Sequence, residues 1–214
     1  MIIGRREWMG SLTGAALLLI PRGLAAASDF WNKKDPSAWT TEQILQLTTR
    51  SPWAQQARVV PRPGRDRGGS YPTASPVAGG KSGGRGTGPD PVIQVAEVTA
   101  VWCSAKPLLD VLKTSFPMDF TGHYVISMEL PPGPGGKVPN RDNIEASLEV
   151  KSKGSVGVGA IQLRRQAAIF GFSKELLPIA ASDKDVVFML QTDQYSIRAR
   201  FEPKEMIYRG VLAV

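Results

Sequence analysis

The sequence predicts an α+β fold. Its main part is a mainly antiparallel, β-rich single domain of sandwich-like architecture with two short helices, preceded by a short helical segment and a disordered linker. Beyond residue 91, short runs rich in β-branched and aromatic residues follow one another closely. Several of these runs alternate apolar and polar positions, which is typical of half-buried strands. The helical patterns come before most of the strands, and this grouping is typical of α+β domains.

We divide the chain into a signal peptide (1–27), a short aromatic-rich helical segment (28–57), a disordered linker (58–91) and the β-rich domain (92–214). The formal net charge is +7, and most of the basic excess lies in the leader and the linker. A nucleic-acid-binding domain carries its basic excess on a folded face. Since the β-rich domain is nearly neutral, we expect no nucleic-acid partner.

The first 27 residues have the pattern of an export signal. Arg5 and Arg6 precede an apolar run over 12–20, and the small residues Ala25 and Ala27 complete an A-x-A cleavage motif. The run has about nine residues, well below the roughly 20 that cross a bilayer, so we expect no transmembrane helix in the mature protein. The pattern predicts cleavage after Ala27 by signal peptidase, and a location in the periplasm or outside the cell.

Two export routes remain open. The stretch around Arg5 and Arg6 resembles the twin-arginine motif, with Trp8 and Met9 in its two bulky apolar places. The flanking glycines depart from that motif, and a general secretory signal with an adjacent arginine pair is the alternative. The twin-arginine resemblance implies folding before transport. A single cysteine, Cys103, agrees with this because it allows no intramolecular disulfide.

The segment before the linker contains a capped helix. Thr40 and Gln43 stand three positions apart in the pattern of a capping box, and the apolar residues that follow predict a helix over about 41–49. The helix ends before Pro52, because a residue that precedes proline disfavours the helical conformation. Such a short helix is marginal in water by itself. We therefore expect it to pack against the rest of the protein.

Three tryptophans, Trp31, Trp39 and Trp53, surround this helix in the sequence. They form either a clamp that holds the helix against the domain or a cage for a ligand. Because aromatic side chains mainly serve burial, we favour the clamp.

Residues 58–91 alternate proline, glycine and serine with arginine, and they contain few large apolar side chains. This composition cannot bury enough apolar surface to offset the entropy of ordering, which predicts disorder. The arginines form either a solvated tether or an attractive surface for an anionic polymer or lipid headgroup of the cell envelope.

In the β-rich domain, periodicity predicts strands at 92–102, 123–130, 156–163, 167–173, 186–192, 195–201 and 206–214, and a short helix from Lys106. A hairpin turn is expected at Asp193-Gln194. In the strand at 123–130, alternation places Tyr124 toward the core and Val125 toward solvent. Asn140–Ser152 fits both a strand and a helix capped by Asn140, and we favour the helix.

A family resemblance spans most of the mature chain. It is carried by Phe30-Trp31, Asp35-Pro36-Ser37-Ala38-Trp39, Glu42-Gln43-Ile44, Ser51-Pro52-Trp53-Ala54, Val101-Trp102, 182–188 and 201–212. These residues resemble a group of uncharacterised bacterial exported proteins, in which a W…PSxWT…SPWA opening precedes a linker and a β-rich domain. The resemblance implies the same layout here, and it brings no activity, ligand or catalytic residue with it.

Side chains suited to catalysis or metal binding are sparse. The chain has one histidine, His123, and one cysteine, Cys103, which are too few for a zinc site. A nucleophilic Cys103–His123 pair is the alternative, but free cysteine in an apolar strand is usually a small buried side chain. We expect no catalytic residue, no cofactor and no metal ligand, and the sequence favours a protein that is not an enzyme.

Together these patterns predict an exported binding or scaffold protein of the cell envelope, with a protein or an anionic envelope molecule as its partner. A periplasmic enzyme or small-ligand binder, with a site assembled from scattered polar residues, is the alternative.

Overall fold

The computed structural model describes residues 29–62, 97–113, 115–132, 138–164 and 167–214. The predicted leader, with Arg5, Arg6, Trp8, Met9, Ala25 and Ala27, lies outside these residues. So do most of the predicted linker and the first five residues of the strand expected from Val92.

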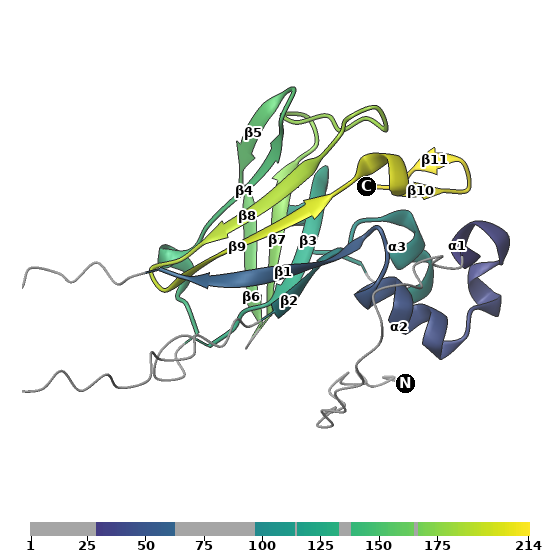
Figure 1. Cartoon of the computed structure of the whole chain (residues 1–214), viewed down its shortest axis with the longest axis horizontal. Helices are drawn as coiled ribbons and strands as arrows, with labels where there is room; N and C mark the ends of the chain where they lie inside the picture. Colours follow the sequence, from purple (N-terminus) through teal and green to yellow (C-terminus); the bar gives the residue numbers. More distant parts are fainter. Residues whose placement is uncertain (1–28, 63–96, 114, 133–137, 165–166) are drawn as a thin grey trace, which may run out of the picture.

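Nine strands form one antiparallel sheet in the order β5-β4-β8-β9-β1-β2-β3-β7-β6, curled into a half-barrel (Figure 1). They are β1 (Ala54–Pro61), β2 (Glu97–Trp102), β3 (His123–Glu129), β4 (Glu145–Val150), β5 (Gly154–Gly157), β6 (Ala160–Arg164), β7 (Ala167–Ser173), β8 (Val186–Gln191) and β9 (Tyr195–Phe201). A separate hairpin consists of β10 (Ile207–Tyr208) and β11 (Val211–Leu212). The sheet confirms the predicted fold class, which is mainly antiparallel β with few short helices.

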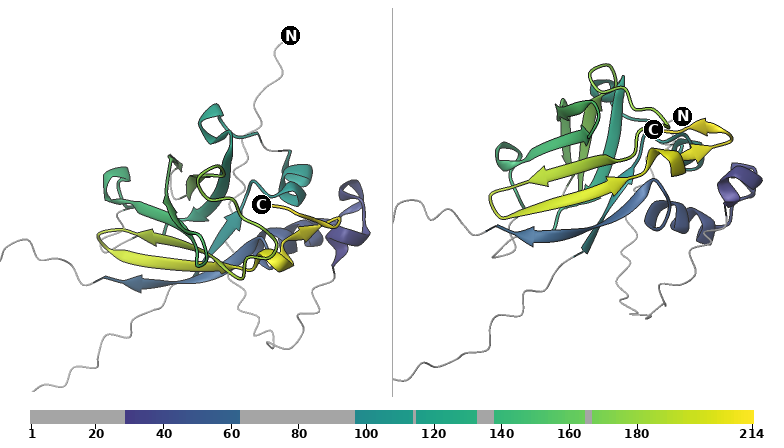
Figure 2. Two further views of the ribbon diagram at one scale, coloured as in Figure 1. Left: turned by 90° about the horizontal axis from the view of Figure 1, so that it is seen from above. Right: turned by 45° about the horizontal axis from the view of Figure 1, so that its top comes forward.

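The helices are α1 (Phe30–Lys33), α2 (Thr41–Thr49) and α3 (Lys106–Leu112), with short 3-10 turns η1 (Pro36–Ala38), η2 (Met118–Phe120), η4 (Arg141–Asn143) and η5 (Pro203–Glu205). All three α-helices gather at one end of the half-barrel, next to the β10–β11 hairpin (Figures 1 and 2). The outer face of β8, β9 and β1 is left free of helices (Figure 2).

Two places in the chain join the two halves of the half-barrel. Strand β1 pairs with β2 over Ala54–Arg58 and with β9 over Val59–Pro61, so it bends from one half to the other. The strands at the two ends of the sheet, β5 and β6, are separated by only Val158 and Gly159. The N–H of Val158 donates to Ala146 of β4, and the N–H of Gly159 donates to Gly171 of β7.

Aromatic side chains fill the space between the two halves. Trp102 of β2 meets Phe201 of β9 edge to face, with ring centroids 5.1 Å apart. Phe170 and Phe172 of β7 contact Phe188 of β8 at 5.5 and 6.0 Å. All five side chains are fully buried. Burial of rings of this size is a main source of stability, and here it holds the halves together.

The capped helix is confirmed. The Thr40 hydroxyl accepts from the N–H of Gln43, and the Gln43 side chain accepts from the N–H of Thr40. Trp31, Trp39 and Trp53 are all buried in the core, which agrees with the predicted clamp. The segment before the linker therefore belongs to the same hydrophobic core as the sheet.

The favoured helix at Asn140–Ser152 is wrong. Asn140 caps only the single 3-10 turn η4, where its side-chain oxygen accepts from the N–H of Arg141. Strand β4 follows, and its even-numbered side chains Ala146, Leu148 and Val150 are buried. Pairing with both β5 and β8 decides between the two periodicities in favour of the strand.

The structure differs from the sequence-based predictions in three further places, each confined to a few residues. The strand expected at 156–163 is divided at Val158-Gly159, and the strand expected at 206–214 is a hairpin. In that hairpin Arg209 (φ 51°) and Gly210 (φ 81°) adopt the left-handed conformation that a tight type I′ turn requires. Val125 is buried because η2 covers the outer face beside it: a Cβ at its cross-strand partner Gly171 would lie 2.9 Å from the ring of Phe120.

The sequence did not predict β1. The last four residues of this strand, 58–61, lie in the stretch assigned to the linker. In β1 the side chains of Ala57 and Val59 enter the core, whereas those of Arg58 and Val60 point outward.

Candidate functional site

A groove of about 430 Å³ lies on the outer face of the sheet, over β8, β9 and β1. Its outward-facing residues are Gln56, Arg58 and Val60 of β1, Met189 and Gln191 of β8, and Ser196 and Arg198 of β9. We call these seven residues the arginine groove. Ala57, Leu190 and Ile197, whose side chains are buried on the inner face, complete the lining.

Strand alternation places both arginines of the groove on the same face. Val59 pairs with Ile197, and both side chains enter the core. The neighbouring residues Arg58 and Arg198 therefore point outward. At Arg58 strand β1 turns away from β9 and pairs with Glu97 of β2 instead. The bend of β1 thus lies at the side of the groove.

Arg58 and Arg198 form no ion pair or side-chain hydrogen bond with the part of the chain that the structure describes. The neighbouring arginines differ. Arg200 binds Asp185 with an Nε to Oδ1 distance of 2.7 Å, and Arg62 donates to the carbonyl of Thr192 at 2.9 Å. Within the described residues, the two groove arginines thus form no such contact that holds the fold.

Two permanent positive charges that line one groove repel each other without a counterion. Glu97 of β2 lies across from Arg58 on the outer face, but no ion pair forms between them. An anion bound between the guanidiniums relieves this repulsion and receives charge-assisted hydrogen bonds.

The rest of the groove is mixed in character. Val60 keeps 55% of its surface exposed, and Met189 is partly buried. Gln56 and Gln191 supply amides, and Ser196 supplies a hydroxyl. Charged, amide and aliphatic groups thus border one hollow, so the groove offers charge, hydrogen bonds and apolar contact to a ligand.

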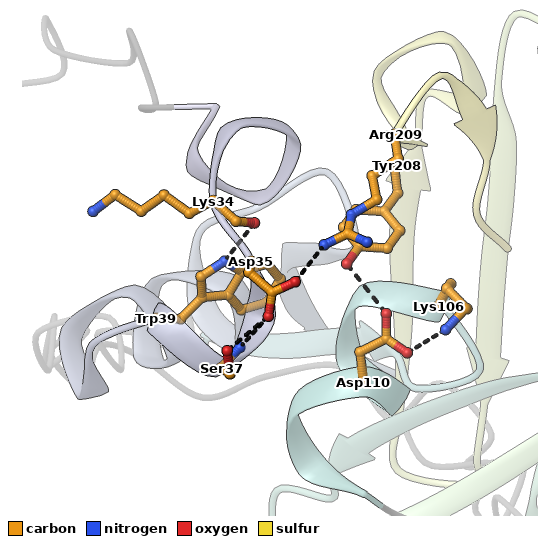
Figure 3. A network of polar contacts seen from close by, with 8 residues as sticks. All are labelled: Lys34, Asp35, Ser37, Trp39, Lys106, Asp110, Tyr208 and Arg209. Atoms are coloured by element: carbon orange, nitrogen blue, oxygen red, sulfur yellow. Dashed lines mark hydrogen bonds and ion pairs between the residues drawn. The ribbon is translucent and has the colours of Figure 1, made fainter.

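A second polar cluster joins the aromatic-rich segment to the β10–β11 hairpin and α3 (Figure 3). Arg209 binds Asp35 at 3.4 Å, and the Tyr208 hydroxyl donates to Asp110, which also pairs with Lys106. Each of these five side chains has a partner in the cluster. We read the cluster as structural.

The pKa values in this cluster fit that reading. Hydrogen bonds from the hydroxyl and the N–H of Ser37 lower the pKa of Asp35, with a smaller contribution from Arg209. Burial raises the pKa of Tyr208, and its hydrogen bond to Asp110 raises it further. The carboxylate thus stays charged and the phenol stays neutral, as their bonds require.

The geometry does not favour the Cys103–His123 pair. Burial raises the pKa of the Cys103 thiol to about 11, whereas a nucleophilic cysteine needs a lowered pKa. His123 at the start of β3 places Nδ1 2.8 Å from the carbonyl oxygen of Thr121. Among the described residues, no three or more histidine, cysteine or acidic side chains come together to hold a metal ion. Within the same residues, no helix is long and apolar enough to cross a membrane.

Comparison with models of protein families, with curated proteins and with solved structures finds no match to this chain. The resemblance to the exported family therefore stays a prediction. Sequence reasoning missed the arginine groove, because Arg58 was assigned to the linker and no motif connects it to Arg198.

Proposed function

We propose that this protein is an exported, non-enzymatic binding protein of the cell envelope, and that the arginine groove binds an anionic partner. The observation that carries the proposal is the pair Arg58 and Arg198, outward on neighbouring strands and without an ion-pair partner among the described residues. The leader motif of Arg5, Arg6, Trp8 and Met9 supports export, by twin-arginine or general machinery, to the periplasm or the outside.

The groove is suited to binding rather than to bond breaking. Arginine stays protonated at any physiological pH, so it holds and orients anions but does not serve as a general base. Glutamine and serine side chains next to it donate and accept hydrogen bonds, which adds selectivity to the charge attraction.

The binding test uses the mature chain, residues 28–214, and polyphosphate as a simple anionic probe. We expect saturable binding that weakens about tenfold or more in the double variant Arg58→Gln, Arg198→Gln, because two charge-assisted contacts are lost. The matched control is the double variant Arg50→Gln, Arg164→Gln, which also removes two charges; both arginines are exposed and lie outside the groove, after α2 and at the end of β6. Equal loss in both variants would mean that only overall charge matters, and the groove would not be the site.

Export is tested separately on the full chain. Replacement of both Arg5 and Arg6 by lysine should leave unprocessed protein in the cytoplasm if the twin-arginine route operates, because that machinery reads the arginine pair. A general secretory signal should tolerate the change, since it needs only positive charge. Mass spectrometry of the periplasmic fraction reports whether cleavage follows Ala27. Unprocessed, cytoplasmic protein from the unaltered chain would contradict export by either route.

A small-ligand binder is the second candidate, and the groove volume of about 430 Å³ favours it, since ligand pockets commonly measure about 300–1,000 Å³. Native mass spectrometry of the protein recovered from the periplasm distinguishes the two. Added mass that survives desalting and leaves on denaturation indicates a small ligand, whereas a bare chain that binds polyphosphate supports the macromolecular partner.

A further inference from the structure

The arginine groove has the size and the chemistry of a site for a short stretch of extended polypeptide. Along β1 it runs from Gln56 to Val60. Four steps along a strand cover about 13 Å at 3.3 Å per residue, so the groove accommodates roughly four residues of extended chain. A single small anion would contact the arginines and leave the rest of this length unused.

The apolar part of the groove limits which classes of ligand can use the whole site. Val60 of β1 and Met189 of β8 border the same hollow as the arginines. A phosphate polymer offers nothing to these side chains, whereas an aliphatic side chain next to a carboxylate uses both. Methionine adapts to partners of different shape, which is common on peptide-binding surfaces.

The polar residues fit the backbone of such a segment. Amide groups of Gln56 and Gln191 both donate and accept, and the hydroxyl of Ser196 does the same. A peptide backbone presents alternating N–H and C=O groups, which pair with this set. None of the described residues that line the groove is aromatic, so these residues offer no stacking surface of the kind on which nucleobases bind.

We infer that the arginine groove binds a short acidic segment of a partner polypeptide, with a carboxylate between Arg58 and Arg198 and an aliphatic side chain on Val60 and Met189. This inference rests on the proposed function and names its ligand. Glu97 lies beside Arg58 across the β1–β2 pair, and it repels the acidic ligand at that edge.

The test is a titration of the isotope-labelled mature protein, residues 28–214, followed by amide NMR shifts, which suit weak binding. The probe is a capped peptide of four residues that alternates glutamate with leucine. One control peptide has glutamine in place of glutamate, and another has serine in place of leucine. We expect shifts concentrated at 56–60, 189–191 and 196–198, and at least fivefold weaker binding of both control peptides.

Protein variants locate the contacts. Arg58→Gln with Arg198→Gln should weaken the peptide about tenfold, with Arg50→Gln, Arg164→Gln as the charge-matched control. Val60→Thr keeps the side-chain shape and replaces a methyl by a hydroxyl, so it should weaken the peptide severalfold. Glu97→Gln should strengthen the peptide about twofold, because a repelling charge is removed. Unchanged circular dichroism and melting temperature show that the variants fold.

The outcomes separate the inference from the proposed function. Arginine-dependent binding of polyphosphate without binding of the acidic peptide overturns the inference and leaves the proposed function in place. Equal binding of the leucine and serine peptides also overturns it, since the aliphatic contact would be absent. If neither probe binds, both the inference and the proposed function fail.

Discussion

The indole Nε1 of Trp53 donates to the carbonyl oxygen of Ala213 at 2.7 Å across 160 positions of the chain. Trp53 is fully buried, and its ring also meets Trp31 at a centroid distance of 5.5 Å. This bond ties the segment just before β1 to the segment just after β11. The aromatic-rich segment is thus fixed to the sheet from both directions, through its own rings and through the end of the β10–β11 hairpin.

Trp53→Ala should lower the free energy of unfolding by about 3–5 kcal/mol, because a large buried side chain is lost and a cavity is left. Trp53→Phe should lower it by about 1–3 kcal/mol, since the carbonyl of Ala213 loses its donor. Urea unfolding followed by circular dichroism measures both. Leu45→Ala, at an exposed position of α2, is the control and should change little. A cost for Trp53→Ala no larger than the control would contradict the structural role.

Thr40→Ala should lower the free energy of unfolding by about 1 kcal/mol, because the capping box at the start of α2 loses one of its two hydrogen bonds. Thr40→Ser keeps a hydroxyl and should keep most of the stability. Thr41→Ala, one position later in the helix, is the matched control and should be nearly neutral. The melting temperatures of the three variants test this prediction. Equal losses of stability in Thr40→Ala and Thr41→Ala would show that the capping box does not stabilise the helix.

Stability should fall as the pH rises from about 9 toward about 11, because the pKa of Cys103 rises from 9.0 in its ordinary state to about 11 in the folded protein. The unfolded chain loses the thiol proton first, and the folded state keeps it. The contribution of Cys103 is therefore complete below pH 9.0 and is lost as the pH passes through the folded pKa.

Cys103→Ser removes this dependence, since serine does not titrate in the range. Urea unfolding in the presence of a reductant at about pH 8 and about pH 10.5 compares the variant with the parent chain. A smaller decline in the variant is expected. Burial also raises the pKa of Tyr195 from 10.0 to about 12, so both proteins should lose stability equally from about pH 10 upward. Parallel pH profiles below about pH 10.5 would show that Cys103 is not shielded.

Lys153→Met should lower the free energy of unfolding by about 2 kcal/mol, because it leaves the buried carboxylate of Asp183 without its cation. The two groups lie 2.8 Å apart, and the Asp183 side chain is only 7% exposed. The loss of a fully buried pair costs about 3–5 kcal/mol, and the partial exposure of Lys153 reduces this figure. Lys204→Met, in the exposed pair with Glu202, is the control and should leave the free energy of unfolding nearly unchanged.

The Lys153–Asp183 pair also makes the stability of the fold depend on pH in the acid range. Desolvation by itself raises the pKa of Asp183, but hydrogen bonds from Lys153 and the N–H of Ala180 outweigh it, and the pKa lies below the ordinary 3.8. The contribution of Asp183 is therefore present above pH 3.8 and is lost as the pH falls through the folded pKa. Lys153→Met should reduce this acid dependence, and an unchanged acid profile would contradict the pairing.

The sequence predicted what short-range chemistry determines. Thr40 and Gln43 cap α2 within one turn, so their pattern alone predicts the helix. Asn140–Ser152 satisfied two periodicities, and only the neighbours β5 and β8 decide between them. The end of β1 contains Arg58 and Pro61, and such residues are also typical of a linker. Whether this stretch forms a strand depends on its pairing with β2 and β9. The arginine groove could not be predicted for the same reason, because only the pairing of β1 with β9 brings Arg58 and Arg198 to one groove.

The place of β1 has a consequence for translation. Of the strands in the described residues it is the first to leave the ribosome, yet it lies in the middle of the sheet, between β2 and β9. Synthesis must pass Phe201 before both neighbours exist, and contacts between such distant segments form slowly. The nascent chain therefore carries a central strand with one unpaired edge until β9 has been made. A chain released before β9 is made has no finished half-barrel and exposes its apolar face to aggregation or to chaperones.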